Sequence, residues 1–331
     1  MESSRARRGH RARARRHTLM STALASVAIV GATAGGTVYV QARAHSGTAS
    51  VSSSTSPTVG SAGGEATVEP VAEASAEPVA DLDALLADAM AAVTVPDAAE
   101  LSVAVLELDS GQSATYGDGV FDTASIVKVD ILAALLLQAQ DDGRQLTAAE
   151  KSYASAMIES SDNASASALW RLIGAAEGLD AANERLGLTG TEGGDGMLWG
   201  LTRTTAADQL TLLRQVFGDG SELREASRTY LRTLMGRIAA DQHWGVSAAA
   251  DGSAWALKNG WLPRSTTGLW DINSIGRVTT ANGTDCLVVV LSNGNATKER
   301  GIALVEAAAR AAVSVFTDGS AASSASAAVS R

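Results

Sequence analysis

The order in which two kinds of sequence periodicity follow one another restricts the fold of this chain most strongly. Segments 101–108 and 113–116 alternate apolar and polar residues around Asp109-Ser-Gly111, which is a hairpin signal. A helical block comes next, followed by strand-like segments at 254–258, 270–280 and 286–292 and a closing helix at 298–315. This order predicts an α+β domain in which flanking helices interrupt one mostly antiparallel, five-stranded sheet.

The helical block has apolar residues spaced for one face of a helix in each of its segments. The first segment, 126–140, is strongly apolar and begins directly after Ser125. The others are expected at 148–158, 164–173, 179–186, 206–217 and 222–238. Together they predict an all-helical subdomain, and a further helix is expected at 81–93.

Composition limits the folded domain to residues 81–317. Residues 44–80 consist mainly of Ser, Thr, Gly, Ala, Glu and Pro, which bury too little apolar surface to fold, so we expect a disordered linker. The same argument predicts a disordered tail at 318–331. The remaining single domain is long enough to bury a large core.

The N-terminal 43 residues have the pattern of a targeting segment. Seven arginines lie between Arg5 and Arg16, and an uncharged stretch follows at 18–41. The pattern predicts an export signal or an uncleaved membrane anchor. We therefore expect an exported domain, extracellular or tethered to the outer face of the cytoplasmic membrane, that contacts the membrane only through this segment.

The charge distribution argues against a nucleic-acid-binding function. Eight arginines and one glutamate give residues 1–43 a charge of +7, so the rest of the chain carries −17 of the formal net charge of −10. Phosphate binding needs clustered Lys and Arg, which this acidic body lacks. We expect a monomer that binds a small molecule.

Histidine and cysteine are too few for several common kinds of active site. Three of the four histidines, His10, His17 and His45, lie outside the expected domain, which leaves His243 and the single cysteine, Cys286. These two cannot form a Cys/His zinc site, and the surroundings of His243 do not resemble those of a nucleophile-linked base. No glycine-rich phosphate loop is present. We expect neither a metal nor a cofactor.

Lysine is rare, and two lysines lie where serine acyl-transfer chemistry needs them. The chain has only four lysines against 22 arginines. Lysine can lose its proton when it is desolvated, whereas arginine effectively cannot. Lys128 follows Ser125 by three residues at a helix start, so both side chains share a face and the free N–H groups of the helix end can stabilise an oxyanion.

Two further motifs can each be interpreted in two ways. Ser161-Asp-Asn163 could relay a proton and orient a substrate carbonyl, or it could simply cap the next helix. Lys258-Asn259-Gly260 could offer a charge to a substrate carboxylate and let a substrate backbone approach the glycine, or it could be an ordinary strand end with a solvated lysine.

The three motifs in this order resemble those of class A β-lactamases and penicillin-binding D,D-peptidases, which are Ser-x-x-Lys, Ser-Asp-Asn and Lys-Thr-Gly. The resemblance spans residues 81–317 and includes Phe121-x-x-Ala-Ser-x-x-Lys and the helix start at 204–210. It implies a β-lactamase/transpeptidase-like fold. The catalytic residues that it implies are Ser125 as acylated nucleophile, Lys128 as general base and Ser161 as proton relay. The substrate-binding residues that it implies are Asn163, Lys258, Asn259, Gly260 and Trp261, with the N–H groups of Ser125 and Trp261 as oxyanion hole.

Two positions depart from the family pattern. Asn259 stands where the family has Thr or Ser. The Ω-loop equivalent, 187–203, lacks the Glu-x-x-Leu-Asn motif whose glutamate activates the deacylating water, and Glu192 or Asp195 on this glycine-rich, flexible loop are the possible substitutes. Positioned general-base catalysis contributes ~10²–10⁴-fold, so we expect acylation with slow deacylation.

Three functions fit this sequence. The first is an exported serine hydrolase that acts on β-lactam-type amides through a Ser125 acyl-enzyme. The second is a D,D-carboxypeptidase that acts on peptidoglycan stem peptides, and the third is a non-catalytic cell-wall binding module. Four tryptophans near the last motif, Trp244, Trp255, Trp261 and Trp270, are expected to belong to the core except for Trp261, although an aromatic wall is the alternative.

Overall fold

The computed structural model of the protein describes the backbone of residues 81–329 and the side chains of residues 81–317. The leader at 1–43 and the linker at 44–80 lie outside the described residues, so the export signal and the flexible tether stay predictions. All described residues belong to one compact unit of the chain.

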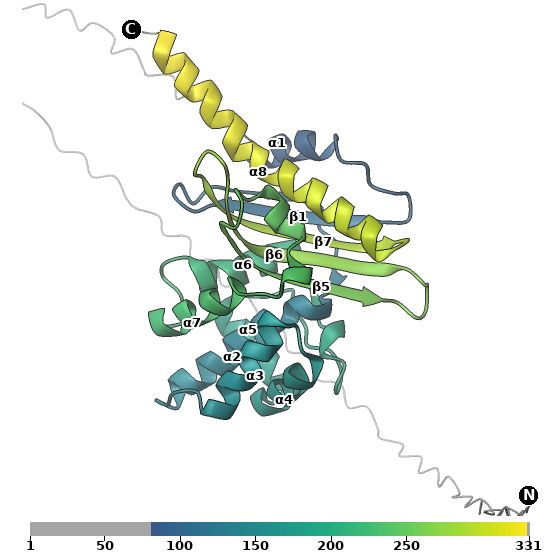
Figure 1. Cartoon of the computed structure of the whole chain (residues 1–331), viewed down its shortest axis with the longest axis vertical. Helices are drawn as coiled ribbons and strands as arrows, with labels where there is room; N and C mark the ends of the chain where they lie inside the picture. Colours follow the sequence, from purple (N-terminus) through teal and green to yellow (C-terminus); the bar gives the residue numbers. More distant parts are fainter. Residues whose placement is uncertain (1–80, 330–331) are drawn as a thin grey trace, which may run out of the picture. The chain divides into compact units, whose positions relative to one another are not determined.

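A five-stranded antiparallel sheet forms the centre of this unit, with the strand order β2-β1-β7-β6-β5 (Figure 1). The strands are β1 (Glu100–Glu107), β2 (Ser113–Tyr116), β5 (Trp255–Pro263), β6 (Trp270–Thr279) and β7 (Asp285–Asn295). β1 and β2 form the predicted hairpin, and β1 pairs along its whole length with β7. The predicted α+β architecture is confirmed, and the helical block lies between β2 and β5 in the chain.

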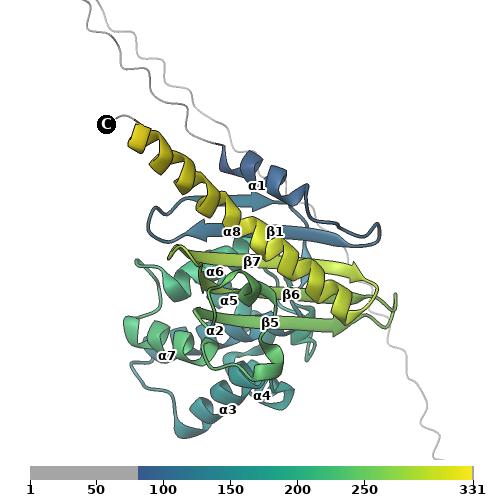
Figure 2. The same ribbon diagram turned by 45° about the horizontal axis from the view of Figure 1, so that its top comes forward.

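The sheet separates two hydrophobic cores. Helices α1 (Leu82–Met90) and α8 (Lys298–Val329) cover one face, and the helical block covers the other (Figures 1 and 2). Strand β7 contributes alternate residues to both cores, Cys286 and Val288 on the α8 side and Leu287 and Val289 on the opposite side. Burial on both faces explains why this strand is continuously apolar rather than alternating. The buried thiol of Cys286 has its pKa raised to about 12 by desolvation and nearby carboxylates.

The helical block packs around α2. Its helices are α2 (Val127–Asp141), α3 (Ala148–Glu159), α4 (Asn163–Ile173), α5 (Ala175–Leu186), α6 (Ala206–Phe217) and α7 (Glu225–Met235). Twelve residues of α2 are buried, including Lys128 and Asp130. A helix that is apolar around its whole circumference belongs in the interior, which is where α2 lies. It therefore supplies a rigid base for the residues at its N-terminal end.

The C-terminal boundary differs from the prediction. We expected a helix to residue 315 and a disordered tail from 318, but α8 continues without interruption to Val329 (Figure 1). Residues 318–329 are rich in alanine, which has the highest helix propensity, and contain no proline to end the helix. Although α8 has 32 residues, neither it nor another described helix is both long and apolar enough to cross a membrane.

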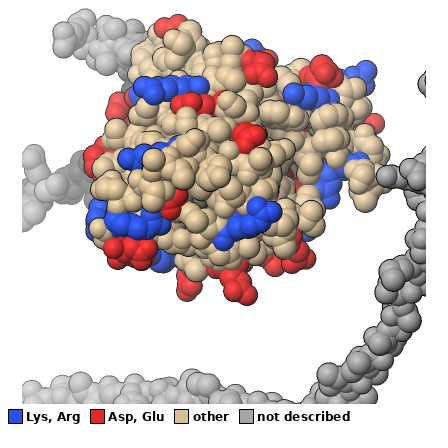
Figure 3. Space-filling view, turned by 60° about the horizontal axis from the view of Figure 1, so that its bottom comes forward, with Lys and Arg blue, Asp and Glu red and all other residues tan. Residues whose placement is uncertain are grey.

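Charged side chains of both signs are interspersed on the face of the molecule shown in Figure 3, and basic side chains do not join into a continuous patch on that face. Several acidic and basic side chains form ion pairs at the surface, such as Arg185 with Asp141. Exposed pairs of this kind contribute little to stability.

Candidate active site

Ser125 lies in a short 3-10 turn, Ala124–Ile126, that leads directly into α2. The segment before it is fixed by its neighbours: Thr123 donates its N–H to Thr202 O, and Asn273 Nδ2 donates to Thr123 O. Ala124 adopts a positive φ of 49°, a conformation that costs energy for a residue with a side chain. The structure thus confirms Ser125 at the helix entrance and holds its backbone in place from β6 and from the loop that precedes α6.

Lys128 is the centre of the site. Its side chain is 0% exposed, and Nζ lies 2.9 Å from Ser125 Oγ, 3.0 Å from Ser161 Oγ and 2.8 Å from Asn163 Oδ1. A fourth acceptor, the carbonyl oxygen of Ser161, is 2.7 Å away. Burial lowers the pKa of Lys128 to about 7, and the negative charge of Asp162 opposes part of this shift. The free amine is therefore available near neutral pH to accept the proton of Ser125.

The Ser161–Asn163 motif caps a helix and also contacts Lys128, with different residues making the two kinds of contact. Asp162 is the N-cap of α4, and its carboxylate accepts the N–H of Ser165 at 2.6 Å. Ser161 has a φ of 54°, and this bend allows the side chains of Ser161 and Asn163 to reach Lys128 on either side of the cap. The predicted proton-relay and orienting residues are therefore in contact with the predicted base.

Lys258 does not reach the cleft. Its side chain is 0% exposed, and Nζ donates to Asn259 O at 2.8 Å and to Gln242 Oε1 at 3.4 Å. It forms no ion pair with a carboxylate among the residues whose side chains are described. Burial and the charge of Lys128 lower the pKa of Lys258 well below its usual value. The interpretation of Lys258 as a solvated strand end is wrong, and its role as a carboxylate anchor stays a prediction.

Asn259 faces away from the cleft, because neighbouring strand residues point to opposite faces. Its amide nitrogen donates to the carbonyl oxygens of Gln242 and Trp244, and its Oδ1 accepts a hydrogen bond from Ser274 Oγ at 2.6 Å. This completely buried side chain stabilises the α8 side of the sheet. This orientation does not support the substrate-binding role that the resemblance implies for Asn259.

Gly260 makes room for the nucleophile rather than for a substrate. A Cβ atom at this position would lie 2.7 Å from Thr123 O, 2.9 Å from Ser125 N and 3.0 Å from Ile126 N. Only glycine allows the backbone of β5 to pack this closely against the turn that carries Ser125. The close approach that we predicted at this glycine exists, but the segment that approaches belongs to the protein.

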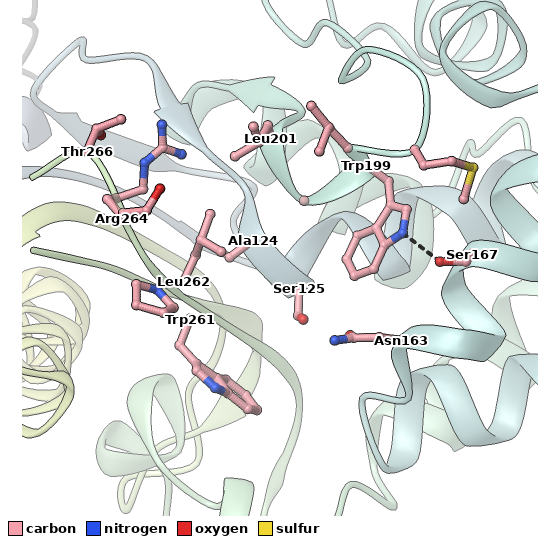
Figure 4. Close-up of a pocket in the computed structure, with 15 residues that line it drawn as sticks. Ala124, Ser125, Asn163, Ser167, Trp199, Leu201, Trp261, Leu262, Arg264 and Thr266 are labelled. Carbon is pink, nitrogen blue, oxygen red and sulfur yellow. Dashed lines mark hydrogen bonds between the residues drawn. The ribbon is translucent and has the colours of Figure 1, made fainter. Parts of the chain in front are cut away.

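The cleft itself has a volume of about 550 Å³ and is bounded by Ser125, the end of β5 and the loop before β4 (Arg203–Thr204) (Figure 4). Trp261 lines it, as expected, and packs edge-on against Trp244 at a centroid distance of 6.0 Å. Trp244 is buried in the core, and His243 packs on Trp255, so these residues are structural. The part of the chain with described side chains contains no group of His, Cys, Asp and Glu that could hold a metal ion.

A family model described as "Beta-lactamase enzyme family" matches residues 137–316, which is more than half of the chain. The chain belongs to this family. The matched region begins after Lys128 and includes the Ser161 and Lys258 motifs. No curated protein sequence shows significant similarity to the chain.

Solved structures of similar fold include penicillin-binding proteins and class A β-lactamases. An acyl-enzyme complex of a PBP-A mutant with penicillin G has a TM-score of 0.61 and 23% identity, covering 71% of this chain and 97% of the other. A β-lactamase from Chitinophaga pinensis has a TM-score of 0.60 and 18% identity, with coverages of 73% and 100%. A class A β-lactamase representative from Bacteroides cellulosilyticus has a TM-score of 0.60 and 14% identity, with coverages of 72% and 97%. These similarities confirm the fold predicted for this member of the β-lactamase family.

The loop at 187–203 of this β-lactamase-family chain is held at several points, contrary to the flexibility that we expected. Its glycine amides donate to carboxylates of the flanking helices, Gly190 N to Asp208 and Gly193 N to Asp180, each at 2.8 Å. The indole N–H of Trp170 on α4 donates to the carbonyl oxygen of Gly196 at 2.7 Å. The glycines permit these tight backbone turns, which composition alone cannot distinguish from flexibility.

Neither possible substitute for the missing glutamate faces the cleft. Glu192 and Asp195 line a separate, smaller pocket on the outer side of the loop. Residues 197–201 of the loop line the cleft, and among them Trp199 has its ring centroid 5.0 Å from Lys128 Nζ. Sequence analysis missed Trp199, and also Arg264 at the far end of the cleft, where its guanidinium contacts Asp122. No local motif marks either residue.

Asp130 is a second buried charge one turn from the site. Its pKa is raised to about 8 by burial and by the nearby carboxylates of Asp180 and Asp208. With its amide nitrogen turned toward Asp130, Asn183 donates to both carboxyl oxygens, at 3.0 and 3.2 Å. At neutral pH this carboxyl group is therefore mostly protonated.

Proposed function

We propose that the protein is a serine hydrolase that acts on β-lactam-type amides through an acyl-enzyme on Ser125. The observation that carries the proposal is the buried amine of Lys128, 2.9 Å from Ser125 Oγ with a pKa of about 7. An amine that is half deprotonated near neutral pH and touches a hydroxyl is suited to activate it as a nucleophile.

Acylation follows from these contacts. The Lys128 amine takes the proton of Ser125 as Oγ forms a bond to the substrate carbonyl carbon, whose electron pair moves onto the oxygen. When this intermediate collapses, the bond from carbon to nitrogen breaks and the leaving nitrogen needs a proton. Ser161 Oγ, 3.0 Å from Lys128 Nζ, can pass on the proton that Lys128 received. Asn163 Oδ1 holds the ammonium in place during this exchange.

The oxyanion would be stabilised by two backbone amides from adjoining segments. Gly260 packs against the amide nitrogen of Ser125, and the next residue, Trp261, lines the cleft. The N–H groups of Ser125 and Trp261 are therefore the candidate donors. One preorganised donor of this kind is worth about 10²–10³-fold in rate.

Deacylation is proposed to be slow. Neither Glu192 nor Asp195 borders the cleft, so the loop supplies no carboxylate that could activate water there. This observation favours a penicillin-binding protein, with D,D-carboxypeptidase action on peptidoglycan stem peptides, as the second candidate function. Both candidates require a substrate outside the cytoplasm, and the arginine-rich leader supports export of the domain.

Labelling with a fluorescent penicillin tests the proposal. Wild-type protein is expected to gain the mass of the intact penicillin on the peptide that contains Ser125, and Ser125→Ala is expected to remain unlabelled. Ser265→Ala, which alters another serine of the same cleft, should be labelled normally. Release within minutes would indicate a β-lactamase, and a persistent label a penicillin-binding protein. A correctly folded wild-type protein that takes up no label would reject the proposal and favour a non-catalytic cell-wall binding module.

A further inference from the structure

The nucleophile and its base differ in their access to solvent. Ser125 is partly exposed in the cleft, whereas the side chain of Lys128 is 0% exposed. The side chains of Ser161 and Asn163 and the carbonyl oxygen of Ser161 accept hydrogen bonds from Nζ. The ring of Trp199 lies beside Nζ, with its centroid 5.0 Å away. Among these contacts, Trp199 alone comes from the loop and makes no hydrogen bond to the amine.

The indole is fixed in this position by a contact of its own. Trp199 Nε1 donates to Ser167 Oγ on α4 at 3.1 Å, the dashed line in Figure 4. The loop therefore attaches to the same helix that begins at Asn163. A cation beside the face of an indole is also attracted to it, which favours this arrangement while Lys128 is protonated.

Hydrolysis of the acyl-enzyme requires water at the amine. A water molecule must give a proton to Lys128 while its oxygen bonds to the ester carbon, after which the bond from that carbon to Ser125 Oγ breaks and Oγ takes the proton back. The water must lie within hydrogen-bond distance of Nζ, about 3 Å. In this structure Nζ contacts Ser125, Ser161 and Asn163 and also lies over the face of the Trp199 ring, 5.0 Å from its centroid.

We propose that Trp199 is a positioning residue that sets the lifetime of the acyl-enzyme by sealing the Lys128 amine from water. The inference rests on the proposed function of Ser125 and identifies the residue that controls its slow step. Acylation does not require water to reach the amine, because Ser125 Oγ is already in contact with Nζ. The Trp199 ring therefore affects the rate of deacylation much more than the rate of acylation.

The loop backbone is held at three points other than the indole, so replacement of the residue leaves most of its anchors in place. Gly190, Gly193 and Gly196 are held by Asp208, Asp180 and Trp170. Leu198, the preceding residue, is 55% exposed and lines the same cleft. Leu198→Ala is accordingly a matched control for the loss of apolar volume from the loop.

The test is release of penicillin from labelled protein, followed by fluorescence and by mass. Trp199→Ala is expected to release the label about tenfold faster or more while acylation changes less, and its release should quicken as pH rises and Lys128 loses its proton. Ser167→Ala keeps the ring but removes its acceptor, and should speed release about fivefold, the worth of one hydrogen bond. Trp199→Phe keeps an aromatic ring but loses the same hydrogen bond, so its release should resemble that of Ser167→Ala, whereas Leu198→Ala should release slowly, as wild type does.

Equal release from wild type, Trp199→Ala and Ser167→Ala would overturn the inference, as would release from Trp199→Phe at the rate of Trp199→Ala. If thermal unfolding shows that Trp199→Ala does not fold, Ser167→Ala decides the question alone, since an alanine is readily accommodated in α4. Failure of wild type to become labelled would reject the proposed function instead, so the two failures are distinguishable.

Discussion

The two sides of the cleft use their motifs in opposite ways. On the α4 side, Ser161 and Asn163 both turn their side chains toward Lys128. On the β5 side, Lys258 is buried and bound to neighbouring protein groups, Asn259 faces the α8 side, and Gly260 contributes by having no side chain at all. The first side supplies functional groups, and the second supplies backbone and a close fit.

Backbone geometry accounts for the difference. A bend at a helix start is free to take unusual angles, and the φ of 54° at Ser161 directs two side chains to one point while Asp162 caps the helix. A strand alternates its side chains between two faces and has no such freedom. A three-residue motif on a strand therefore cannot bring consecutive side chains to one site.

The contrast predicts that the β5 side is most sensitive to added volume. Gly260→Ala would place a methyl group within 3.0 Å of the backbone at Ser125, which cannot move aside as a flexible side chain would. We expect loss of about 10²-fold or more in the rate of penicillin acylation, since small displacements of a nucleophile have effects of this size. Stopped-flow labelling measures the rate.

Gly236→Ala is the matched control, because a methyl group there meets only ordinary contacts at 3.5 Å and beyond. It should acylate like wild type. An unimpaired Gly260→Ala would show that β5 does not hold Ser125 in place.

Replacing one asparagine on each side of the cleft should affect different properties: the acylation rate on the α4 side and the stability on the β5 side. Asn163→Ala removes an acceptor of the Lys128 ammonium. It should slow acylation about 10–100-fold, because hydrogen bonds to charged groups are worth about 1.5–3 kcal/mol. Stability should change little, since the ammonium keeps its acceptors on Ser125 and Ser161. Asn259→Ala leaves the carbonyl oxygens of Gln242 and Trp244 without their donor and should lower the free energy of unfolding by about 2–4 kcal/mol. Acylation per folded molecule should change little.

Urea unfolding and acylation rates for both variants, each normalised to the folded fraction, provide the measurement. The comparison of the two sides breaks down if Asn259→Ala slows acylation as much as Asn163→Ala does.

The smallest effect concerns pH. Lys128 must be neutral to accept a proton, so the acylation rate should rise with pH and level off above a pKa of about 7. The negative charge of Asp162 raises the pKa of Lys128, so Asp162→Asn should shift the profile toward lower pH. Asn caps a helix as well as Asp does, so α4 should stay intact. A profile that does not move, or moves to higher pH, would contradict the proposed influence of Asp162 on the base.

Much of the site could be predicted because its residues lie on elements with strong local signals. Ser125 and Lys128 share one helix face, and the polar run at 161–163 marks the start of the next helix, so their convergence needed only that the two helices pack together. The helix at 206–217 has the predicted limits. The direction of Asn259 was also available, since strand alternation places it opposite Lys258 and Gly260, but the family resemblance outweighed that signal.

Trp199 could not be predicted in the same way. Its position depends on contacts made by other segments: Asp180 of α5, Asp208 of α6 and Trp170 of α4 shape the loop that presents it. Such contacts join residues separated by up to 26 positions along the chain, and no local pattern records them. The burial of Lys258 depends likewise on the 3-10 segment that contains Gln242.

The anchored loop also has a consequence for how such a chain can change over time. Its frame is secured by glycine amides and by groups from three helices, so the side chain at position 199 is one attachment among several. A single codon change there removes the aromatic ring and leaves the other attachments of the loop in place. Under the role proposed for Trp199, descendants of this sequence would have a short route between long-lived and rapidly hydrolysed acyl-enzymes.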